Sequence, residues 1–500
     1  MPAFLLGLDL GTTHIKAGLF DENGVLVAAS SRPTLLRRKL SGETSYDPQE
    51  FWTTAAAVIQ DAVAGAPWGE IAAVGVASMA ETGLLIHRDS GTPRSALIPW
   101  FDPAATTQAE VLRRADDPEE RFYRAGIRPN FKCGLAKILW LQGQGSKILD
   151  GAIWLNAADY LANRLTGCMA TDYSLAGRTY AFDLRRMNWD TDWLQTLGIP
   201  PALFPQPYRS GEQVGIIQQE AAVDTGLRPG TPVAIAGHDH VCAAYGAGAI
   251  RPGIVFDSMG TAEALVGAFP ERPLDAADYH SGLVYGAHVV RGRRYWMGGL
   301  SASGASVEWI RAILGDPALS YEQMEGLLEQ AGPMPTGILY FPYLSGSGSP
   351  HTDLHVRGAF VGIDAAHERA DLVKAVLEGT AYEVEFIRRR AEEILGGPIR
   401  KLVASGGGTR NRGWMQIKAD VSGWEIEAAG MPEATLLGAA LLAGVGVGVY
   451  ADEEAALTAV VRQGGEIYLP DEDRHRIYAE LYERGYLALQ GPLRDASNHF

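Results

Sequence analysis

Two Gly-Thr turns, one in each half of the chain, are the segments best suited to bind phosphate. Residues 11–13 (Gly-Thr-Thr) follow an apolar run that ends near Asp9, and residues 260–261 (Gly-Thr) follow a similar run. Glycine lets the backbone approach a ligand, and successive N–H groups with threonine hydroxyls can cradle phosphate oxygens. Asp9, at a predicted strand end, is placed to hold a hydrated Mg²⁺ ion. An ordinary hairpin explains each turn alone, but two turns that face each other would clamp a polyphosphate chain.

A glycine-rich turn in the second half is the next candidate. Residues 405–411 (Ser-Gly-Gly-Gly-Thr-Arg-Asn) separate an apolar strand from a helix whose apolar face carries Trp414, Ile417 and Val421. Such a turn offers helix N-terminal amides and a surface free of side chains, on which a nucleobase or a phosphate can rest. A loop that needs positive φ angles is the structural alternative. Three consecutive glycines exceed what a turn requires, so we favour the approach of a ligand.

The segment 237–240 (Gly-His-Asp-His) supplies a candidate general base. It follows the apolar run 232–236, and a carboxylate at the end of a strand that faces a cleft can take a proton from a hydroxyl nucleophile. His-Asp-His could instead bind a metal, but in an extended segment the two histidines would point away from Asp239. A helix N-cap role for Asp239 fits the local sequence equally well. Its position relative to the phosphate turns decides between base and cap.

The elements that must position these residues recur along the chain. Residues 4–28 predict a β-meander, with Asn-Gly at 23–24 as its strongest hairpin signal. The pattern returns half a chain later, where the counterparts of Gly11, Thr12, Gly18 and Phe20 are Gly260, Thr261, Gly267 and Phe269. A duplication of this size predicts two similar domains, with their boundary in the Gly/Pro-rich stretch 246–253 and a ligand between them.

The remaining periodicity predicts an α/β fold. Apolar residues recur with helical spacing in the segments 48–64, 132–142, 156–165, 370–393 and 414–420. Apolar strands are predicted between them at 71–77, 232–236 and 401–404. Strands that alternate with helices are typical of layered α/β domains. The most apolar run, 436–450, is 15 residues long, shorter than the roughly 20 needed to cross a bilayer, and predicts a buried helix with its turn.

The composition excludes several classes of function. The chain has 500 residues, with 43 Lys and Arg against 59 Asp and Glu, and a net charge of −16. A net negative charge disfavours non-specific binding to nucleic acid or to an anionic membrane. The three cysteines are few, odd in number and without C-x-x-C spacing, which argues against a disulfide framework or a zinc site. No basic segment precedes the apolar start, so we expect a cytoplasmic protein without a signal peptide.

Further motifs follow one another in a fixed order. They are residues 7–16 (Gly-Leu-Asp-Leu-Gly-Thr-Thr-His-Ile-Lys), 155–161, 164–167, 171–174, 259–261 (Met-Gly-Thr), 303–306 (Ser-Gly-Ala-Ser), 342–346, 406–408 and 438–444. Together they resemble the FGGY family of carbohydrate kinases, which includes glycerol kinase, xylulokinase, gluconokinase and ribulokinase. The resemblance covers nearly the whole chain, and so many ordered matches are highly specific.

The resemblance implies two actin-like (ribonuclease H-like) domains that close over ATP, Mg²⁺ and a sugar or polyol in an interdomain cleft. Residues 1–247 would form the N-terminal domain, with the acceptor and the base, and residues 248–500 the nucleotide domain. By residue-to-residue correspondence, Asp239 would be the catalytic base and Asp9 the metal-associated acid. The implied nucleotide-binding positions are Gly11, Thr12, Thr13 and Lys16 in the first turn, Gly260 and Thr261 in the second, then Gly304, Gly407, Gly408 and, more loosely, Asn411.

The acceptor positions depart from the better-known relatives. Glycerol kinases carry Arg-Glu and xylulokinases Met-His where this chain has Ala80 and Glu81. Glu81 could accept hydrogen bonds from sugar hydroxyls, or be an ordinary surface residue after a strand. Trp100 and Asp102 align with a segment that often lines the acceptor site, although Trp100 also fits plain core packing. His240 replaces the Asn or Gln of several relatives and is placed to donate to another hydroxyl.

The resulting hypothesis is an ATP-dependent kinase of a ketopentose such as xylulose, or of a related open-chain sugar, with Asp239 as general base. A glycerol- or erythritol-type polyol kinase is the alternative within the class, favoured by Glu81 and opposed by Ala80. An ATP-switched actin-like scaffold without catalysis is the alternative from another class. We expect a small-molecule sugar or polyol as partner, no nucleic acid, no membrane, and a homodimer, since many relatives are dimers.

Overall fold

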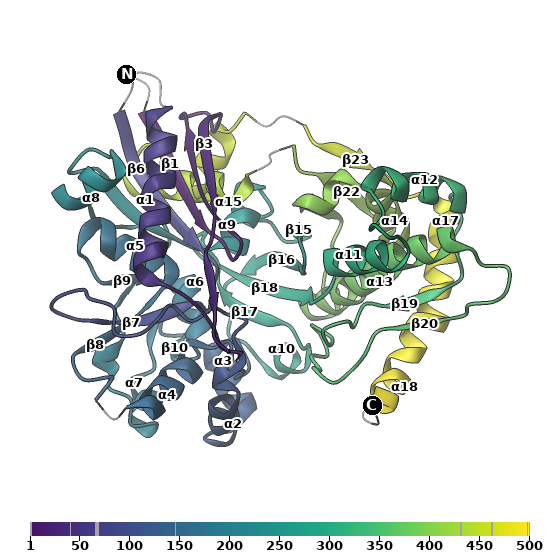
Figure 1. Ribbon diagram of the computed structural model, residues 1–500, viewed down its shortest axis with the longest axis horizontal. Helices are drawn as coiled ribbons and strands as arrows, with labels where there is room; N and C mark the ends of the chain where they lie inside the picture. The colour runs from purple at the N-terminus through teal and green to yellow at the C-terminus, as the bar shows by residue number, and fades with distance from the viewer. Residues whose placement is uncertain are drawn as a thin grey trace.

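Two β-sheets, one from each half of the chain, organise the molecule. The computed structural model describes residues 3–40, 42–65, 70–145, 147–430, 433–461, 464–497 and 499. The two sheets and their helices form two α/β halves that lie side by side, with the first half at the left of Figure 1. The predicted class, a two-domain α/β fold, is confirmed.

The first sheet has six strands. In spatial order they are β13 (Gln213–Ile216), β14 (Pro232–His238), β6 (Glu70–Ser78), β1 (Ala3–Leu10), β2 (His14–Phe20) and β3 (Leu26–Pro33). The strands β1, β2 and β3 form the predicted antiparallel meander, and β6 and β14 continue the sheet in parallel with β1. The two parallel strands therefore end at the same edge of the sheet as β1, beside the turn that follows Asp9.

The second sheet repeats this order and has one additional edge strand, β17. Its strands are β17 (Val284–Ala287), β18 (Arg293–Leu300), β16 (Glu263–Pro270), β15 (Ile254–Met259), β21 (Lys401–Ser405), β22 (Glu425–Ala428) and β23 (Glu466–Tyr468). An antiparallel hairpin, a third antiparallel strand beside it, two parallel strands and an antiparallel edge strand occur in the same order in both sheets. The duplication predicted from the Gly-Thr turns is therefore confirmed in the topology.

Helix α1 (Pro48–Ala64) shows how sequence directs this packing. Asp47 is its N-cap and accepts hydrogen bonds from the backbone N–H groups of Gln49 and Glu50, while Pro48 occupies the first helical position. The buried face of the helix contributes to the same core as Leu6 and Leu8 of β1. Burial of one face at helical spacing explains why the predicted boundaries, 48–64, match the observed ones.

Helix α15 (Ala434–Gly446) belongs to the second half of the sequence but packs between the two sheets. It contacts β1, β6 and β14, together with helix α9 (Asp239–Gly246), and its core includes Leu5 and Phe256, one from each sheet. A Cβ atom on Gly7 would lie 1.9 Å from the Leu436 carbonyl oxygen, so only glycine permits this approach. Burial on all sides accounts for the unbroken apolar run of the predicted helix.

The other elements surround this framework. The remaining helices are α2 (Thr106–Arg114), α3 (Pro118–Ala125), α4 (Gly134–Gln144), α5 (Ala157–Thr166), α6 (Tyr173–Ala176), α7 (Thr191–Thr196), α8 (Gln219–Thr225), α10 (Ala276–His280), α11 (Gly304–Ile313), α12 (Tyr321–Ala331), α13 (Arg369–Leu395), α14 (Arg412–Ser422), α16 (Glu453–Ala459), α17 (Glu472–Leu481) and α18 (Leu487–Ser497). Ten short strands pair outside the two sheets: β4 (Leu36–Arg38) with β5 (Thr44–Tyr46), β7 (Gly83–His87) with β8 (Ala152–Asn156), β9 (Ala170–Asp172) with β12 (Gln206–Tyr208), β10 (Phe182–Asp183) with β11 (Asn188–Trp189), and β19 (Leu339–Phe341) with β20 (Ala359–Val361). Among the described residues, none of these helices has the length and apolar character to traverse a bilayer.

Candidate active site

A cavity of about 220 Å³ lies where the two halves meet. The residues before 250 that line it are Asp9, Lys16, Asp239, His240 and Ala243. The residues after 250 that line it are Phe256, Ser258, Ser405, Gly406, Glu433, Ala434 and Thr435. The candidate base, the candidate metal ligand and the start of the glycine-rich turn therefore share one cavity, although they are far apart in the sequence.

Asp239 enters this cavity as the first residue of α9, directly after β14. His238, not Asp239, is the N-cap residue of the helix, so the capping interpretation of Asp239 is wrong. One carboxylate oxygen, Oδ1, accepts a hydrogen bond of 2.7 Å from the His240 backbone N–H. Burial raises the pKa of Asp239 well above the usual carboxyl range. A carboxyl group whose pKa is raised toward neutrality is suited to accept a proton.

Asp9 lies at the end of β1, paired across the hairpin with Lys16. Burial, and then the negative charges of Asp239 and Glu433, raise the pKa of Asp9, while Lys16 acts in the opposite sense. The Lys16 ammonium contacts the Glu433 carboxylate at 2.9 Å. Asp9 Oδ1 is buried and has no hydrogen-bond partner among the described residues. Three carboxylates around one cavity, with one oxygen unsatisfied, fit a Mg²⁺ ion, which takes oxygen ligands and keeps several waters.

The first Gly-Thr turn is fixed by neighbouring segments. The Gly11 N–H donates to the His14 carbonyl at 3.0 Å, which closes the hairpin. The Thr12 hydroxyl accepts a hydrogen bond of 2.9 Å from the Trp100 indole, and its carbonyl accepts one of 3.2 Å from the Tyr46 hydroxyl. Thr13 is exposed. The indole of Trp100 therefore links the first turn to the segment predicted to bind the acceptor.

The second Gly-Thr turn is held by the start of α11. The Gly304 N–H donates to the Gly260 carbonyl at 3.1 Å, and the Ala305 N–H donates to the Thr261 carbonyl at 3.0 Å. A Cβ atom on Gly304 would lie 2.6 Å from the Gly260 carbonyl oxygen, so glycine is required for this approach. The exposed turn and Gly304 thus form one rigid unit.

The glycine-rich turn runs from the cavity to a second, larger cleft. Gly406, with a φ of 112°, lines the cavity, and a Cβ atom on Gly407 would meet nothing within 4 Å. The side chain of Asn411 caps α14, accepting a hydrogen bond of 2.9 Å from the Trp414 N–H. Asn411 also lines a cleft of about 500 Å³. The space beside the Gly407 Cα atom is therefore open, which would allow a ligand to approach the backbone there.

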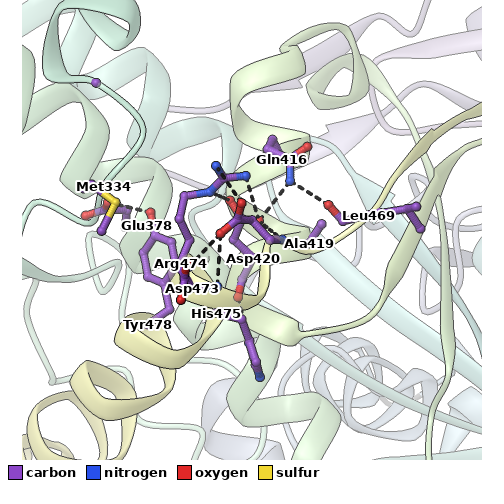
Figure 2. A network of polar contacts seen from close by, with 12 residues as sticks. Met334, Glu378, Gln416, Ala419, Asp420, Leu469, Asp473, Arg474, His475 and Tyr478 are labelled. Atoms are coloured by element: carbon purple, nitrogen blue, oxygen red, sulfur yellow. Dashed lines mark hydrogen bonds and ion pairs between the residues drawn. The ribbon is translucent and has the colours of Figure 1, made fainter.

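Helices α12, α13, α14 and α17 form the walls of this cleft. Its lining includes Leu328 of α12, Lys374 of α13, Gln416 and Asp420 of α14, and Arg474 of α17. Figure 2 shows how α17 contacts α14: Arg474 of α17 donates to Asp420 of α14 at 2.6 Å, and within α14 Gln416 donates to the same carboxylate at 2.9 Å. These contacts fix the positions of Gln416 and Arg474 and leave an open space of nucleoside size between the helices.

Glu81 occupies a strained and buried position, not the surface that one interpretation assigned to it. Its φ is 61° and its side chain accepts a hydrogen bond of 2.7 Å from Arg178, with both residues less than 9% exposed. Lys137 donates to the Glu81 carbonyl and, at 2.8 Å, to the Pro99 carbonyl. A left-handed conformation in a residue other than glycine costs about 1–3 kcal/mol and is typical of functional sites.

Arg178 is a functional candidate that the sequence did not indicate. Two of its guanidinium nitrogens, Nε and Nη1, are buried without a hydrogen-bond partner among the described residues. Its charge helps to lower the pKa of His240, which is next to Asp239, so the guanidinium lies near the base. The ion pair with Glu81 joins segments 97 residues apart, and no local pattern marks such a pair.

Trp100 and Asp102, predicted to bind the acceptor, have different environments. Trp100 is partly exposed, and the Lys132 ammonium lies 4.9 Å from its ring centroid. Asp102 is buried, accepts hydrogen bonds from Thr44 through one oxygen, and accepts one from the Ala104 N–H through the other. Both Asp102 oxygens are therefore satisfied within the protein, whereas the Trp100 ring is only partly buried.

The histidines beside Asp239 do not point away from it. The chain passes from strand to helix at Asp239, and the ligand atoms of His238, Asp239 and His240 lie within 4.8 Å of one another. The extended geometry assumed from the sequence is wrong at this point. Burial and the charge of Arg178 lower the pKa of His240 to about 4, and burial, His240 and Arg178 lower that of His238. The lowered pKa values favour neutral imidazoles, which can hydrogen-bond a hydroxyl or bind a metal.

Family models and known proteins match most of the chain. Residues 4–246 match the family model for the FGGY family of carbohydrate kinases, N-terminal domain, and residues 258–447 match the model for its C-terminal domain. The chain is 28% identical over 484 residues to a xylulose kinase of Staphylococcus epidermidis, covering 96% of this chain and 95% of that one. It is 30% identical over 488 residues to a glycerol kinase of Gloeobacter violaceus, with 96% of each chain covered. Its fold superposes on a gluconate kinase from Lactobacillus acidophilus with a TM-score of 0.91, at 21% identity and 99% coverage of both chains.

Proposed function

Because this chain belongs to the FGGY family of carbohydrate kinases, we propose that it transfers the γ-phosphoryl group of ATP to one hydroxyl of a small sugar or polyol. The observation that carries the proposal is the shared cavity, in which Asp239 lies with Asp9 and with Gly406 of the glycine-rich turn. A non-catalytic scaffold would need no carboxylate there. Membership in the kinase family argues against the scaffold as well.

In the proposed mechanism, positioning and charge neutralisation do most of the work, since phosphoryl transfer has a loose transition state. Asp239 takes the proton from the acceptor hydroxyl, whose oxygen attacks the γ-phosphorus in line; the bond from the γ-phosphorus to the β–γ bridging oxygen breaks, and ADP leaves. The Thr12 and Thr261 turns hold the phosphate oxygens from opposite domains. Asp9 is the proposed ligand of Mg²⁺, with Glu433 close by, and the ion when bound neutralises phosphate charge. Closure of the domains excludes water, which would otherwise compete with the acceptor.

The nucleoside would occupy the 500 Å³ cleft. Asn411, which lines that cleft, follows the glycine-rich turn, and Gly406 at the start of the turn lines the acidic cavity, so a nucleotide could pass from one to the other over the three glycines 406–408. The α14 N-terminus at this junction favours negative charge. Gly304 would contribute through the second turn, whose position it fixes.

Gly407→Ala tests this path. The added methyl group meets no protein atom within 4 Å, so folding should be unaffected and any effect on binding reports the ligand. We expect the Kd for ATP to rise by about tenfold or more, since prevention of one close polar contact costs roughly 1.5–3 kcal/mol. Isothermal titration with ATP and Mg²⁺ measures it. Gly397→Ala, also in open space but away from the cleft, is the matched control. An unchanged Kd in Gly407→Ala would contradict the proposed path.

The acceptor is proposed to be a ketopentose such as xylulose, or a related open-chain sugar. Glu81 supplies a hydrogen-bond acceptor and Arg178 supplies unused donors for hydroxyl groups. The neutral His240 would supply a further hydrogen-bonding group, and the partly exposed aromatic ring of Trp100 suits the C–H side of a sugar. A glycerol- or erythritol-type polyol is the second candidate. It is favoured by the Glu81–Arg178 pair, in which a distant arginine provides the charge that Ala80 lacks.

The pH dependence of kcat/KM should reflect the protonation state of Asp239. Its pKa is raised by burial, so the carboxyl is protonated, and inactive as a base, at a higher pH than an ordinary aspartate. We expect kcat/KM to fall about tenfold per pH unit below that raised pKa and to level off above it. A pH–rate profile between about pH 5 and 9, at saturating Mg²⁺, measures this. A profile that stays flat down to pH 5 would argue against Asp239 as the base.

An acceptor screen tests the function itself. Release of ADP is followed with purified protein, ATP and Mg²⁺ against pentuloses, hexuloses, aldonates, tetritols and glycerol, and the phosphorylated product is identified by mass spectrometry. We expect one class to raise turnover far above the rate with water alone. A flat rate over the whole panel, with ATP bound, would favour the scaffold.

We also propose the division of the chain into an acceptor domain, residues 1–247, and a nucleotide domain, residues 248–500. The equivalent strand order of the two sheets supports it. The predicted homodimer stays a prediction, which sedimentation equilibrium would test.

A further inference from the structure

A buried ion cluster lies beneath the second Gly-Thr turn. Lys418 of α14 donates to Asp257 of β15 at 2.7 Å and contacts Glu263 of β16, so that it bridges one acid on each side of the turn 260–261. All three side chains are at most 2% exposed. Burial opposes the charge on Lys418, but the two carboxylates outweigh burial and raise its pKa, so the ammonium is retained.

The cluster extends to the segment that holds the turn from the other side. The Ser303 hydroxyl donates to Glu263, and the Ser303 N–H donates to the Thr261 carbonyl at 3.1 Å. Ser303 directly precedes Gly304, whose N–H holds the Gly260 carbonyl. The turn is therefore fixed from two sides: by backbone hydrogen bonds from the segment at the start of α11, and by the Lys418 cluster.

The same helix that carries Lys418 also forms one wall of the large cleft. Asn411 at the N-cap of α14, with Gln416 and Ile417 along it, lines the cleft, whereas Lys418 is buried and reaches the β15–β16 hairpin. Figure 2 shows Arg474 of α17 donating to Asp420 of this helix, and Gln416, one turn earlier in the helix, donating to the same carboxylate. Helix α14 thus contacts both the proposed nucleoside cleft and the hairpin that carries the second phosphate turn.

We propose that Lys418 is a positioning residue that sets the spacing between the nucleoside cleft and the second phosphate turn, so that one nucleotide can contact both. This inference rests on the proposed function, since it assumes that the nucleoside part of ATP lies in the cleft and its terminal phosphates reach Gly260 and Thr261. Lys418 itself touches neither. Substitution of Lys418 should therefore weaken the binding only of ligands that reach from the cleft to the turn.

Comparison of ATP with AMP separates this role from general stability. AMP reaches the cleft but lacks the phosphates that would reach the turn. For Lys418→Met we expect the Kd for ATP to rise at least about tenfold while the Kd for AMP changes less than about twofold, because removal of one partner from a buried ion cluster displaces the groups left unpaired. If Lys418 only stabilised the fold, its substitution would lower the fraction of protein able to bind nucleotide. The ratio of the ATP affinity to the AMP affinity would then stay unchanged.

Two further variants keep the test decisive. Glu263→Gln preserves the shape of the cluster and the contact of Lys418 with Asp257, and should change the ATP-to-AMP ratio in the same direction by a smaller factor. Arg388→Met removes a buried charge from α13 of the same half, where Arg388 pairs with Glu385, and should leave the ratio unchanged.

The outcomes distinguish the two proposals. If the unaltered protein bound ATP no more tightly than AMP, or bound neither, the proposed nucleotide site would be wrong. If the unaltered protein favours ATP but Lys418→Met and Glu263→Gln keep the same preference, or lose both ligands in parallel, the positioning role is wrong and the kinase proposal stands.

Discussion

Asp239→Asn is expected to lower turnover of the phosphorylated acceptor by about 10²- to 10⁴-fold, which is the usual contribution of a general base. The amide keeps the shape of the side chain and can still accept the hydrogen bond from the His240 N–H, but it cannot take a proton. The Kd for ATP should change little, since the loss concerns the acceptor proton. Stopped assays of product with titration of ATP measure both quantities.

A matched control separates loss of the base from loss of any buried aspartate. Asp190 is fully buried and pairs with Arg121, outside the cavity. Asp190→Asn should lower the melting temperature but leave turnover within about threefold, since it weakens a buried pair without touching the reacting groups. Wild-type turnover in Asp239→Asn would remove that residue from the role of base.

Arg178→Met is expected to lower kcat/KM for the acceptor by about 10²- to 10³-fold. The substitution removes the guanidinium donors near His240 that are proposed to bind the acceptor, and the loss of a hydrogen bond to a charged group costs about 1.5–3 kcal/mol. It also leaves the buried Glu81 carboxylate without its partner, which destabilises the fold. The effect should fall on the acceptor: kcat/KM for the acceptor changes, while the Kd for ATP does not.

The double variant Arg178→Met with Glu81→Gln distinguishes recognition from stability. Removal of both charges should restore much of the melting temperature, since no carboxylate is left unpaired, but should leave acceptor binding weak. Arg178→Lys should recover part of the activity because it keeps the charge. A fall in melting temperature with an unchanged kcat/KM would show that the pair is structural only.

The repeated hairpins and the main helices could be predicted because their signals are local. A few adjacent residues are enough to indicate each of these structures. The examples are the Asn-Gly turn at 23–24, the Asp47–Pro48 start of α1 and the apolar faces of α13 and α14. The repeated Gly-Thr pair, at 11–12 and at 260–261, indicated the duplication because both hairpins have the same short turn. The buried helix α15 was predicted since its apolar run has no polar face.

The pairs that complete the site could not be predicted, because they join distant segments. Lys16 meets Glu433 across 417 residues, and Glu81 meets Arg178 across 97. Nothing in the neighbourhood of Arg178 distinguishes it from a surface arginine. At Asp239 the local pattern was misleading in another way, since the change from strand to helix brings His238 and His240 to the same side as the carboxylate.

The proposed mechanism requires that the end of a triphosphate, held by both domains, meets an acceptor hydroxyl beside Asp239. A crystal structure with a non-hydrolysable ATP analogue, Mg²⁺ and the acceptor found in the screen tests it most directly. We predict terminal phosphate oxygens between the Thr12 and Thr261 turns and an acceptor hydroxyl within hydrogen-bond distance of the Asp239 carboxylate. A nucleotide bound away from both turns, or an acceptor whose hydroxyls do not reach Asp239, would contradict it.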